Sequence, residues 1–86
     1  MATLTVNTST KFGTNFNGGR GIIQVTGVGT SVTVQGSLDS TTWTDIEVFE
    51  SDTIKEILIP PYVKYSAVGG TPLVQIVEAM AFRTGR

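Results

Sequence analysis

The sequence predicts an all-β fold, namely a small antiparallel β-sandwich of about seven strands with a long N-terminal loop or arm. Residues with a branched Cβ are frequent, with 10 Val, 7 Ile and 14 Thr, together 31 of the 86 residues. Branching at Cβ disfavours helices and suits pleated strands. The 10 Gly and 3 Pro residues interrupt the chain at short intervals, and no segment shows a 3.6-residue apolar period over three helical turns.

The length predicts a single domain over residues 1–86. The net charge is −1, and the six Lys and Arg residues are scattered, so we expect no binding to nucleic acid or to an anionic membrane. Cys and His are both absent. Their absence excludes disulfides, thiol nucleophiles, His or Cys metal sites and the commonest general base. The first residues show neither a signal peptide nor a membrane span, so folding in the cytoplasm is expected.

Alternation of apolar and polar residues, bounded by turn-forming residues, predicts seven strands. They are residues 3–7, 22–26, 31–38, 43–49, 53–59, 62–68 and 73–79. Most are expected to pair as consecutive hairpins. Residues 8–21 are rich in Asn, Thr and Gly and are predicted to form the long loop or arm. Residues 80–86 are predicted to form a short tail.

The segment between the third and fourth predicted strands contains three local signals. Asp39-Ser40-Thr41 is expected to form a tight connection, because short polar side chains can bond the turn backbone. Gly36 falls at an inward position and leaves room for a large neighbour. The alternation changes phase after Trp43, so either a bulge near Thr44–Asp45 resets it or Trp43 caps the end of the fold.

The predicted strands 53–59 and 73–79 are apolar on both faces. One face carries Ile57, Ile59, Val74 and Ile76, and the other carries Ile54, Leu58, Leu73 and Val77. A sheet with one wet face alternates apolar and polar residues, and a chain of this size lacks a third layer. The second apolar face is therefore expected to be covered by other copies of the chain. The alternative is that bulges and strand twist gather both sets into one core.

Candidate catalytic residues are few, and no enzyme is expected. Five carboxylates lie close together in the sequence: Asp39, Asp45, Glu47, Glu50 and Asp52. A glycosidase needs two carboxylates in a cleft, whereas a strand and a turn expose them as a solvated, repulsive edge. A Ca²⁺ site at the Asp39 turn is an alternative. Gly18-Gly19-Arg20-Gly21 lacks the Lys-Ser/Thr of a phosphate loop and precedes a strand, which indicates a turn.

Three aromatic residues could bind a ligand. Trp43, Tyr62 and Tyr65 would form a sugar-stacking platform if all three were exposed on one surface. The other interpretation is that Trp43 is a core residue or a plug at the end of the fold.

Two segments carry a resemblance to a known class of proteins. Residues 31–46 (SVTVQGSLDSTTWTDI) resemble the strand, Ser-x-Asp-Gly-x-x-Trp, strand hairpin of small virion β-sandwich proteins of tailed phages, and discoidin-like domains have a similar hairpin. Residues 59–71 (IPPYVKYSAVGGT) also look like the phage type. Ser40 departs from the pattern, which usually has Gly there. The chain is far shorter than a discoidin-like domain, which favours the phage class.

The resemblance, which covers about residues 20–79, implies a structural virion role. The leading expectation is a capsid decoration (cement) protein on the capsid exterior, a homotrimer that binds the major capsid protein and needs no cofactor. Its trimer interface is placed at Ile54, Leu58, Leu73 and Val77, and its capsid-docking arm at residues 11–20, with Lys11, Phe12, Phe16 and Arg20. The alternatives are a carbohydrate-binding module, a head fibre and a neck or tail component.

Overall fold

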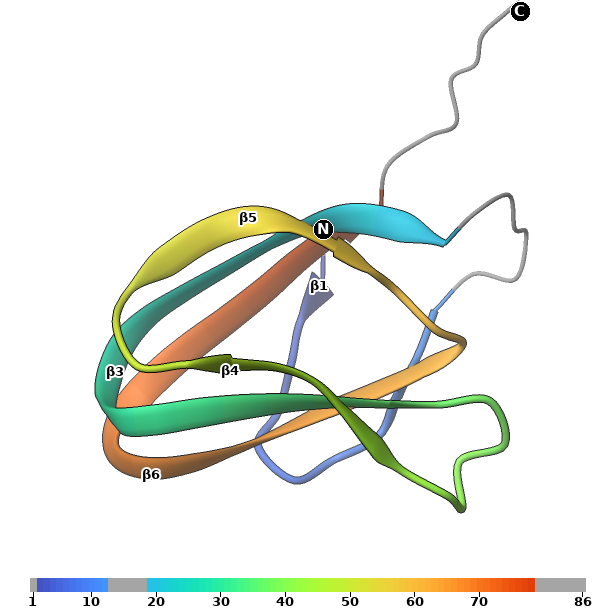
Figure 1. Cartoon of the computed structure of the whole chain (residues 1–86), viewed down its shortest axis with the longest axis horizontal. Coiled ribbons are helices and arrows are strands. Elements are labelled where there is room, and N and C mark those ends of the chain that lie inside the picture. Colours follow the sequence, from blue (N-terminus) through green and yellow to red (C-terminus); the bar gives the residue numbers. More distant parts are fainter. Residues whose placement is uncertain (1, 13–18, 79–86) are drawn as a thin grey trace, which may run out of the picture.

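The computed structural model describes residues 2–12 and 19–78, and it shows an all-β fold (Figure 1). The predicted fold class is therefore confirmed. Six strands form one antiparallel sheet. They are β1 (Ala2–Thr3), β2 (Thr10–Lys11), β3 (Arg20–Ser37), β4 (Thr44–Phe49), β5 (Thr53–Leu58) and β6 (Tyr62–Glu78).

The two long strands β3 and β6 replace four of the strands predicted from the sequence. Predicted strands 22–26 and 31–38 are parts of β3, and predicted strands 62–68 and 73–79 fall on β6. The chain does not reverse between them; it bends and keeps pairing, with Val28 opposite Gly70. The predicted succession of hairpins is also wrong after β4, because β5 pairs with β3 and not with β4.

Glycines allow β3 and β6 to bend together. Gly70 has a φ of 68°, a left-handed conformation that a side chain disfavours. A Cβ on Gly70 would lie 2.7 Å from the carbonyl oxygen of Gly27, and a Cβ on Gly29 would collide with the backbone of Gly69 and Gly70. Close backbone contact at the bend therefore requires glycine on both strands.

The bend folds the sheet over so that its two halves face each other (Figure 1). The first half of β3 lies between β5 and the second half of β6, and the second half of β3 lies between β4 and the first half of β6. Apolar side chains of both halves and of the N-terminal segment form one core: Leu4, Phe12, Ile23, Val25, Val32, Val34, Phe49, Ile57, Ile59, Val63, Tyr65, Val74 and Ile76.

A β-bulge in β4 corrects the phase of this strand. Val34 pairs with Glu47, whereas its neighbour Gln35 pairs with Asp45, so Ile46 is the extra residue. The bulge turns Phe49 into the core, where its side chain is 3% exposed. The predicted bulge near Thr44–Asp45 is confirmed, one residue further along the chain.

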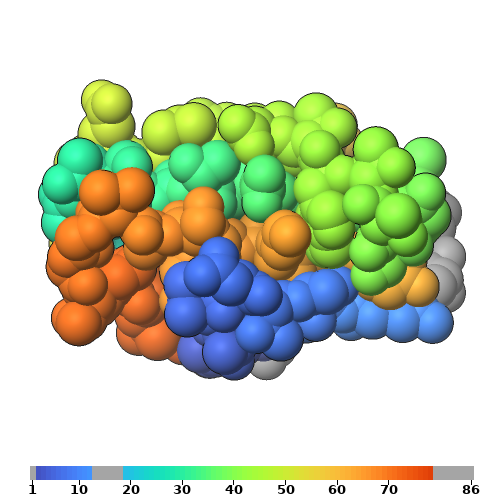
Figure 2. Space-filling model, turned by 90° about the horizontal axis from the view of Figure 1, so that it is seen from below, coloured from blue at the N-terminus to red at the C-terminus, as the bar shows by residue number. Residues whose placement is uncertain are grey.

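The N-terminal segment follows β6, contrary to the prediction of a strand at 3–7 and a loop from residue 8. Only Ala2 and Thr3 form β1, and β2 lies inside the predicted loop. Backbone N–H groups of Leu4, Asn7 and Phe12 donate to carbonyls of Val74, Tyr65 and Pro61 at 2.7–2.9 Å. Figure 2 shows this segment, in blue, against β6 in orange.

Candidate functional site

The outward side of one half of the folded sheet is rich in apolar residues. We call it the outer face and define it by the outward-pointing residues of β5, of β3 up to Thr26 and of β6 from Leu73 onward. Residues paired across an antiparallel ladder share a face, and the pairs Ile22–Val77, Thr26–Leu73, Gln24–Ile54 and Arg20–Leu58 place all of these side chains outward. Its large apolar members and their exposed fractions are Ile22 (45%), Ile54 (64%), Leu58 (62%), Leu73 (47%) and Val77 (46%).

The opposite side of the same strands lies in the core. Ile57, Val74 and Ile76 are at most 6% exposed, whereas their outward neighbours are about half exposed. The two apolar sets predicted from the sequence therefore face opposite ways. The alternative that twist and bulges gather both sets into one core is wrong, because these strands keep a regular alternation.

The four residues predicted to form a trimer interface, Ile54, Leu58, Leu73 and Val77, all lie on the outer face. Sequence reasoning missed Ile22, which stands opposite Val77 at the centre of this face. The signal was present, because Ile22 is two residues from Gln24 and hence on the same side of the strand.

The outer face has few charged groups, and they balance. Arg20 and Glu56 form an ion pair at 3.6 Å between Nη1 and Oε1, with side chains 57% and 59% exposed. Gln24 lies between Ile54 and Gln75 on the central strand of this half. Such a face suits contact with another weakly charged apolar surface and offers no concentration of charge for nucleic acid.

The predicted capsid-docking residues do not form one exposed group. Phe12 is 6% exposed and packs in the core, so its assignment as a docking anchor is wrong: the apolar ring is more stable in the core than in water. Lys11 is exposed on β2, and Arg20 starts β3 and pairs with Glu56. Phe16 lies outside the described residues.

The three aromatic candidates do not form an exposed platform. Tyr65 is 5% exposed and belongs to the core. Trp43 and Tyr62 are half-buried. The ammonium of Lys64 lies 4.4 Å from the centroid of the Trp43 ring, a cation–π geometry. A ring face that already carries a side-chain cation is poorly placed to stack on a sugar.

The connection between β3 and β4 is tied together by side chains, as predicted. Asp39 Oδ1 accepts hydrogen bonds from the backbone N–H groups of Thr41 and Thr42 at 2.9 Å, and from the Ser37 hydroxyl at 2.9 Å. These bonds, that of Thr42 first, hold the pKa of the Asp39 carboxyl below its usual 3.8. Ser40 has a φ of 67°, the left-handed conformation for which the resembling hairpins use glycine.

Most of the predicted carboxylate cluster has structural partners. Besides Asp39, Asp45 accepts from the Gln35 amide at 3.0 Å, Glu47 Oε2 lies 3.1 Å from Lys55 Nζ, and Asp52 accepts from the Val28 N–H at 3.1 Å. Across residues 2–12 and 19–78, no three acidic side chains come together in a group able to hold a metal ion. These four carboxylates thus tie local structure together.

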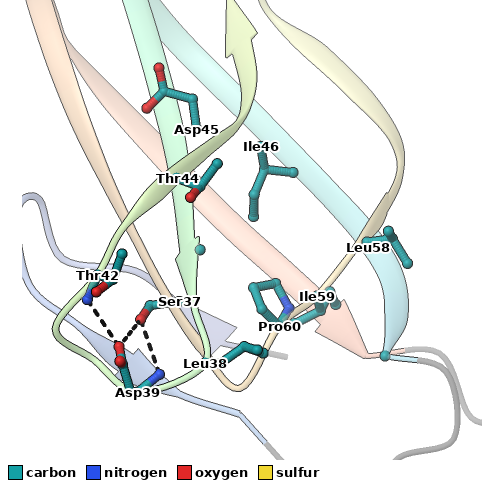
Figure 3. Close-up of a pocket in the computed structure, with 12 residues that line it drawn as sticks. Ser37, Leu38, Asp39, Thr42, Thr44, Asp45, Ile46, Leu58, Ile59 and Pro60 are labelled. Atoms are coloured by element: carbon teal, nitrogen blue, oxygen red, sulfur yellow. Dashed lines mark hydrogen bonds between the residues drawn. The ribbon is translucent and has the colours of Figure 1, made fainter.

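A pocket of about 560 Å³ opens between the β3–β4 connection and the end of β5 (Figure 3). Its lining is Gly19, Gly36, Ser37, Leu38, Asp39, Thr42, Thr44, Asp45, Ile46, Leu58, Ile59 and Pro60. A Cβ on Gly36 would collide with Pro60 Cγ and lie 2.8 Å from Ile46 Cδ1. The predicted room beside Gly36 is therefore confirmed, and these two side chains fill it.

No family model, curated protein or solved structure matches the chain. The resemblance to phage virion proteins accordingly stays a prediction. Within the described part of the chain, no helix has the length and apolar character needed to cross a membrane.

Proposed function

We propose that this protein is a structural virion component, a decoration (cement) protein that binds the assembled head of a tailed phage from outside. Its partner in this proposal is the major capsid protein, and its working form is a homotrimer made in the host cytoplasm. The observation that carries the proposal is the outer face, where five large apolar side chains remain 45–64% exposed. The hairpin resemblance supplies the virion setting.

The mechanism would be stabilisation by mass action. A protein that binds the assembled shell and not its separated subunits stabilises the shell by RT ln(1 + [L]/Kd), about 2.7 kcal/mol per site at a hundredfold excess over Kd. Repetition of this contribution over the many equivalent sites of a shell would oppose the outward pressure of packaged DNA. This role needs a rigid surface and no catalytic group.

The outer face is assigned to contact between copies. Burial of exposed apolar surface contributes about 25 cal/mol per Å², and the residues that would supply it here are Ile22, Ile54, Leu58, Leu73 and Val77. The docking arm is revised accordingly: Lys11 stays available at the surface, Arg20 belongs to the outer face, where it pairs with Glu56, and Phe12 supports the fold.

Electron microscopy of purified heads with and without the protein tests this function. Heads incubated with the protein should show added density on the outer surface at repeated symmetry positions. Bare heads after incubation with a saturating excess would contradict the proposal. Heat treatment of the same two samples measures stabilisation, and decorated heads should release their DNA at a higher temperature.

The same outer face would also serve a neck or tail connector subunit. Connectors form rings of higher order, so the mass of the assembly in solution separates a connector from a trimeric decoration protein. Density confined to the portal vertex would favour the connector.

A further inference from the structure

The pocket beside the β3–β4 connection has the features of a binding site. Pro60 and Ile46 pack against Gly36 and form apolar walls, with Ile59 next to them (Figure 3). Leu38, which directly follows β3, is 80% exposed. A largely exposed leucine beside an apolar hollow is typical of an interaction site.

The charged side chains that line this pocket have one sign, and the neighbouring Arg20 is paired with Glu56. Asp39 and Asp45 belong to its lining, and no Lys or Arg is among the described lining residues. Lys64 on β6 and Asp45 on β4 both pair with Gln35 on β3, but the ammonium of Lys64 lies over the Trp43 ring. The hydrogen bonds to Asp39 come from neutral groups, so they stabilise the negative charge and do not cancel it.

We infer that this pocket binds an extended segment of a partner protein in which an aliphatic residue and an Arg or Lys are separated by one residue, so that both side chains point to the same side of the segment. The aliphatic side chain enters between Leu38, Ile46 and Pro60, and the cation lies beside Asp39 or Asp45. Charge complementarity selects this occupant, because a cation beside the two carboxylates is attracted and an acidic segment is repelled. The identification of this partner with the major capsid protein rests on the proposed function. The inference that the pocket is a binding site does not rest on it.

Titration of the full-length protein with short capped peptides, followed by ¹H–¹⁵N NMR, tests the site. The probe, called the Leu-Arg peptide, is acetyl-Ser-Leu-Ser-Arg-Ser-amide. The matched controls replace its Leu by Ser or its Arg by Glu, and the second of these is the Leu-Glu peptide. The Leu-Arg peptide should saturably shift the amide signals of Leu38, Ile46, Leu58 and Ile59. We expect a Kd in the millimolar range, which corresponds to a binding free energy of about −4 kcal/mol. The Leu-Glu peptide should bind at least about fivefold more weakly.

Variants of the protein locate the contacts. Leu38→Ser removes an exposed side chain and should weaken binding by about tenfold without changing the fold. Asp39→Asn and Asp45→Asn keep an acceptor oxygen for the turn and for Gln35, and each should weaken binding about two- to fivefold. Glu50→Gln, an equal loss of charge at an exposed residue outside the pocket, should leave the affinity unchanged.

Two results would overturn the inference: equal affinity for the Leu-Arg and Leu-Glu peptides, or no saturable shift at the pocket. Failure here and failure of the proposed function are distinguishable. A protein that binds the peptide but never adds to heads keeps the site and loses the decoration role. If the protein does not bind the peptide, and its Leu38→Ser variant adds to heads as well as the wild type does, the decoration role stands and the proposed site is wrong.

Discussion

Ile22 and Val77 lie directly opposite each other on β3 and β6 and both point away from the core, with exposed fractions of 45% and 46%. Their chain neighbours Ile23 and Ile76 form the next pair and are 0% and 1% exposed. The same two strands thus carry apolar pairs on both sides of the sheet. The inner pair is covered by the other half of the folded sheet, whereas the described residues leave the outer pair about half exposed.

A Phe12 variant tests whether this residue belongs to the core and not to an exposed docking arm. Its ring is 6% exposed in the core, so Phe12→Ala should lower the free energy of unfolding by about 3–5 kcal/mol. Urea denaturation measures the change. Lys11→Ala, at the exposed neighbouring position, should stay within about 0.5 kcal/mol of the wild type. Equal stability of the two variants would mean that Phe12 lies outside the core.

Ser40 tests the conformation of the β3–β4 connection. At a φ of 67° an L-residue is strained relative to glycine by about 1–2 kcal/mol, and glycine loses about 0.5–1 kcal/mol through chain entropy. Ser40→Gly should therefore stabilise the protein by up to about 1.5 kcal/mol, and its N–H can still donate to Ser37 Oγ. Thr41→Gly, whose φ is not positive, should destabilise. A loss of stability in Ser40→Gly contradicts the turn geometry.

Asp39 predicts a pH dependence of stability. Its folded-state pKa lies below 3.8, so its charge contributes stability that is present above pH 3.8 and is lost as the pH falls through the folded pKa. Thermal melting of the wild type and Asp39→Asn should differ most near neutral pH and converge in strong acid. A difference in melting temperature that stays constant from neutral to acidic pH would show that the charge of Asp39 is not involved.

Lys55 tests how the open edges of the sheet avoid aggregation. It pairs with the buried Ile23, so its side chain points inward from β5, which pairs only with β3 among the described strands. Its ammonium lies 3.1 Å from Glu47 Oε2 on β4. An inward charge on an edge strand opposes pairing with other chains, so Lys55→Val should increase light scattering on storage. Lys55→Arg is the control, and equal scattering of the two variants would contradict this role.

The alternation of residues was enough to predict the fold class and the two-faced strands. Ile54, Leu58, Leu73 and Val77 could be placed on one face because a strand has a period of two, whatever its partners. Gly36 and the bulge after Thr44 were predictable for the same reason, since each interrupts the alternation. These features depend on local pattern alone.

The connections between strands depended on contacts that the sequence does not display. Gly27 to Thr30 and Gly69 to Pro72 carry the composition of turns, yet β3 and β6 pass through them because the two strands bend against each other. Phe12 stands in a polar, glycine-rich segment, and the pairing of β2 with β6 together with the backbone bond from its N–H to Pro61 brings it to the core. The pocket likewise joins residues far apart in sequence, such as Leu38 and Leu58.

The claim on which the account depends is that further copies of the chain cover the outer face. Sedimentation equilibrium of the wild type at micromolar concentration measures this directly, with Ile22→Lys on the outer face and Val68→Lys, an exposed residue of the other half, as a matched pair. The account predicts a wild-type mass of about three chains, one chain for Ile22→Lys, and no change for Val68→Lys. A stable single chain for the wild type, with Ile22→Lys indistinguishable from it, would contradict the account.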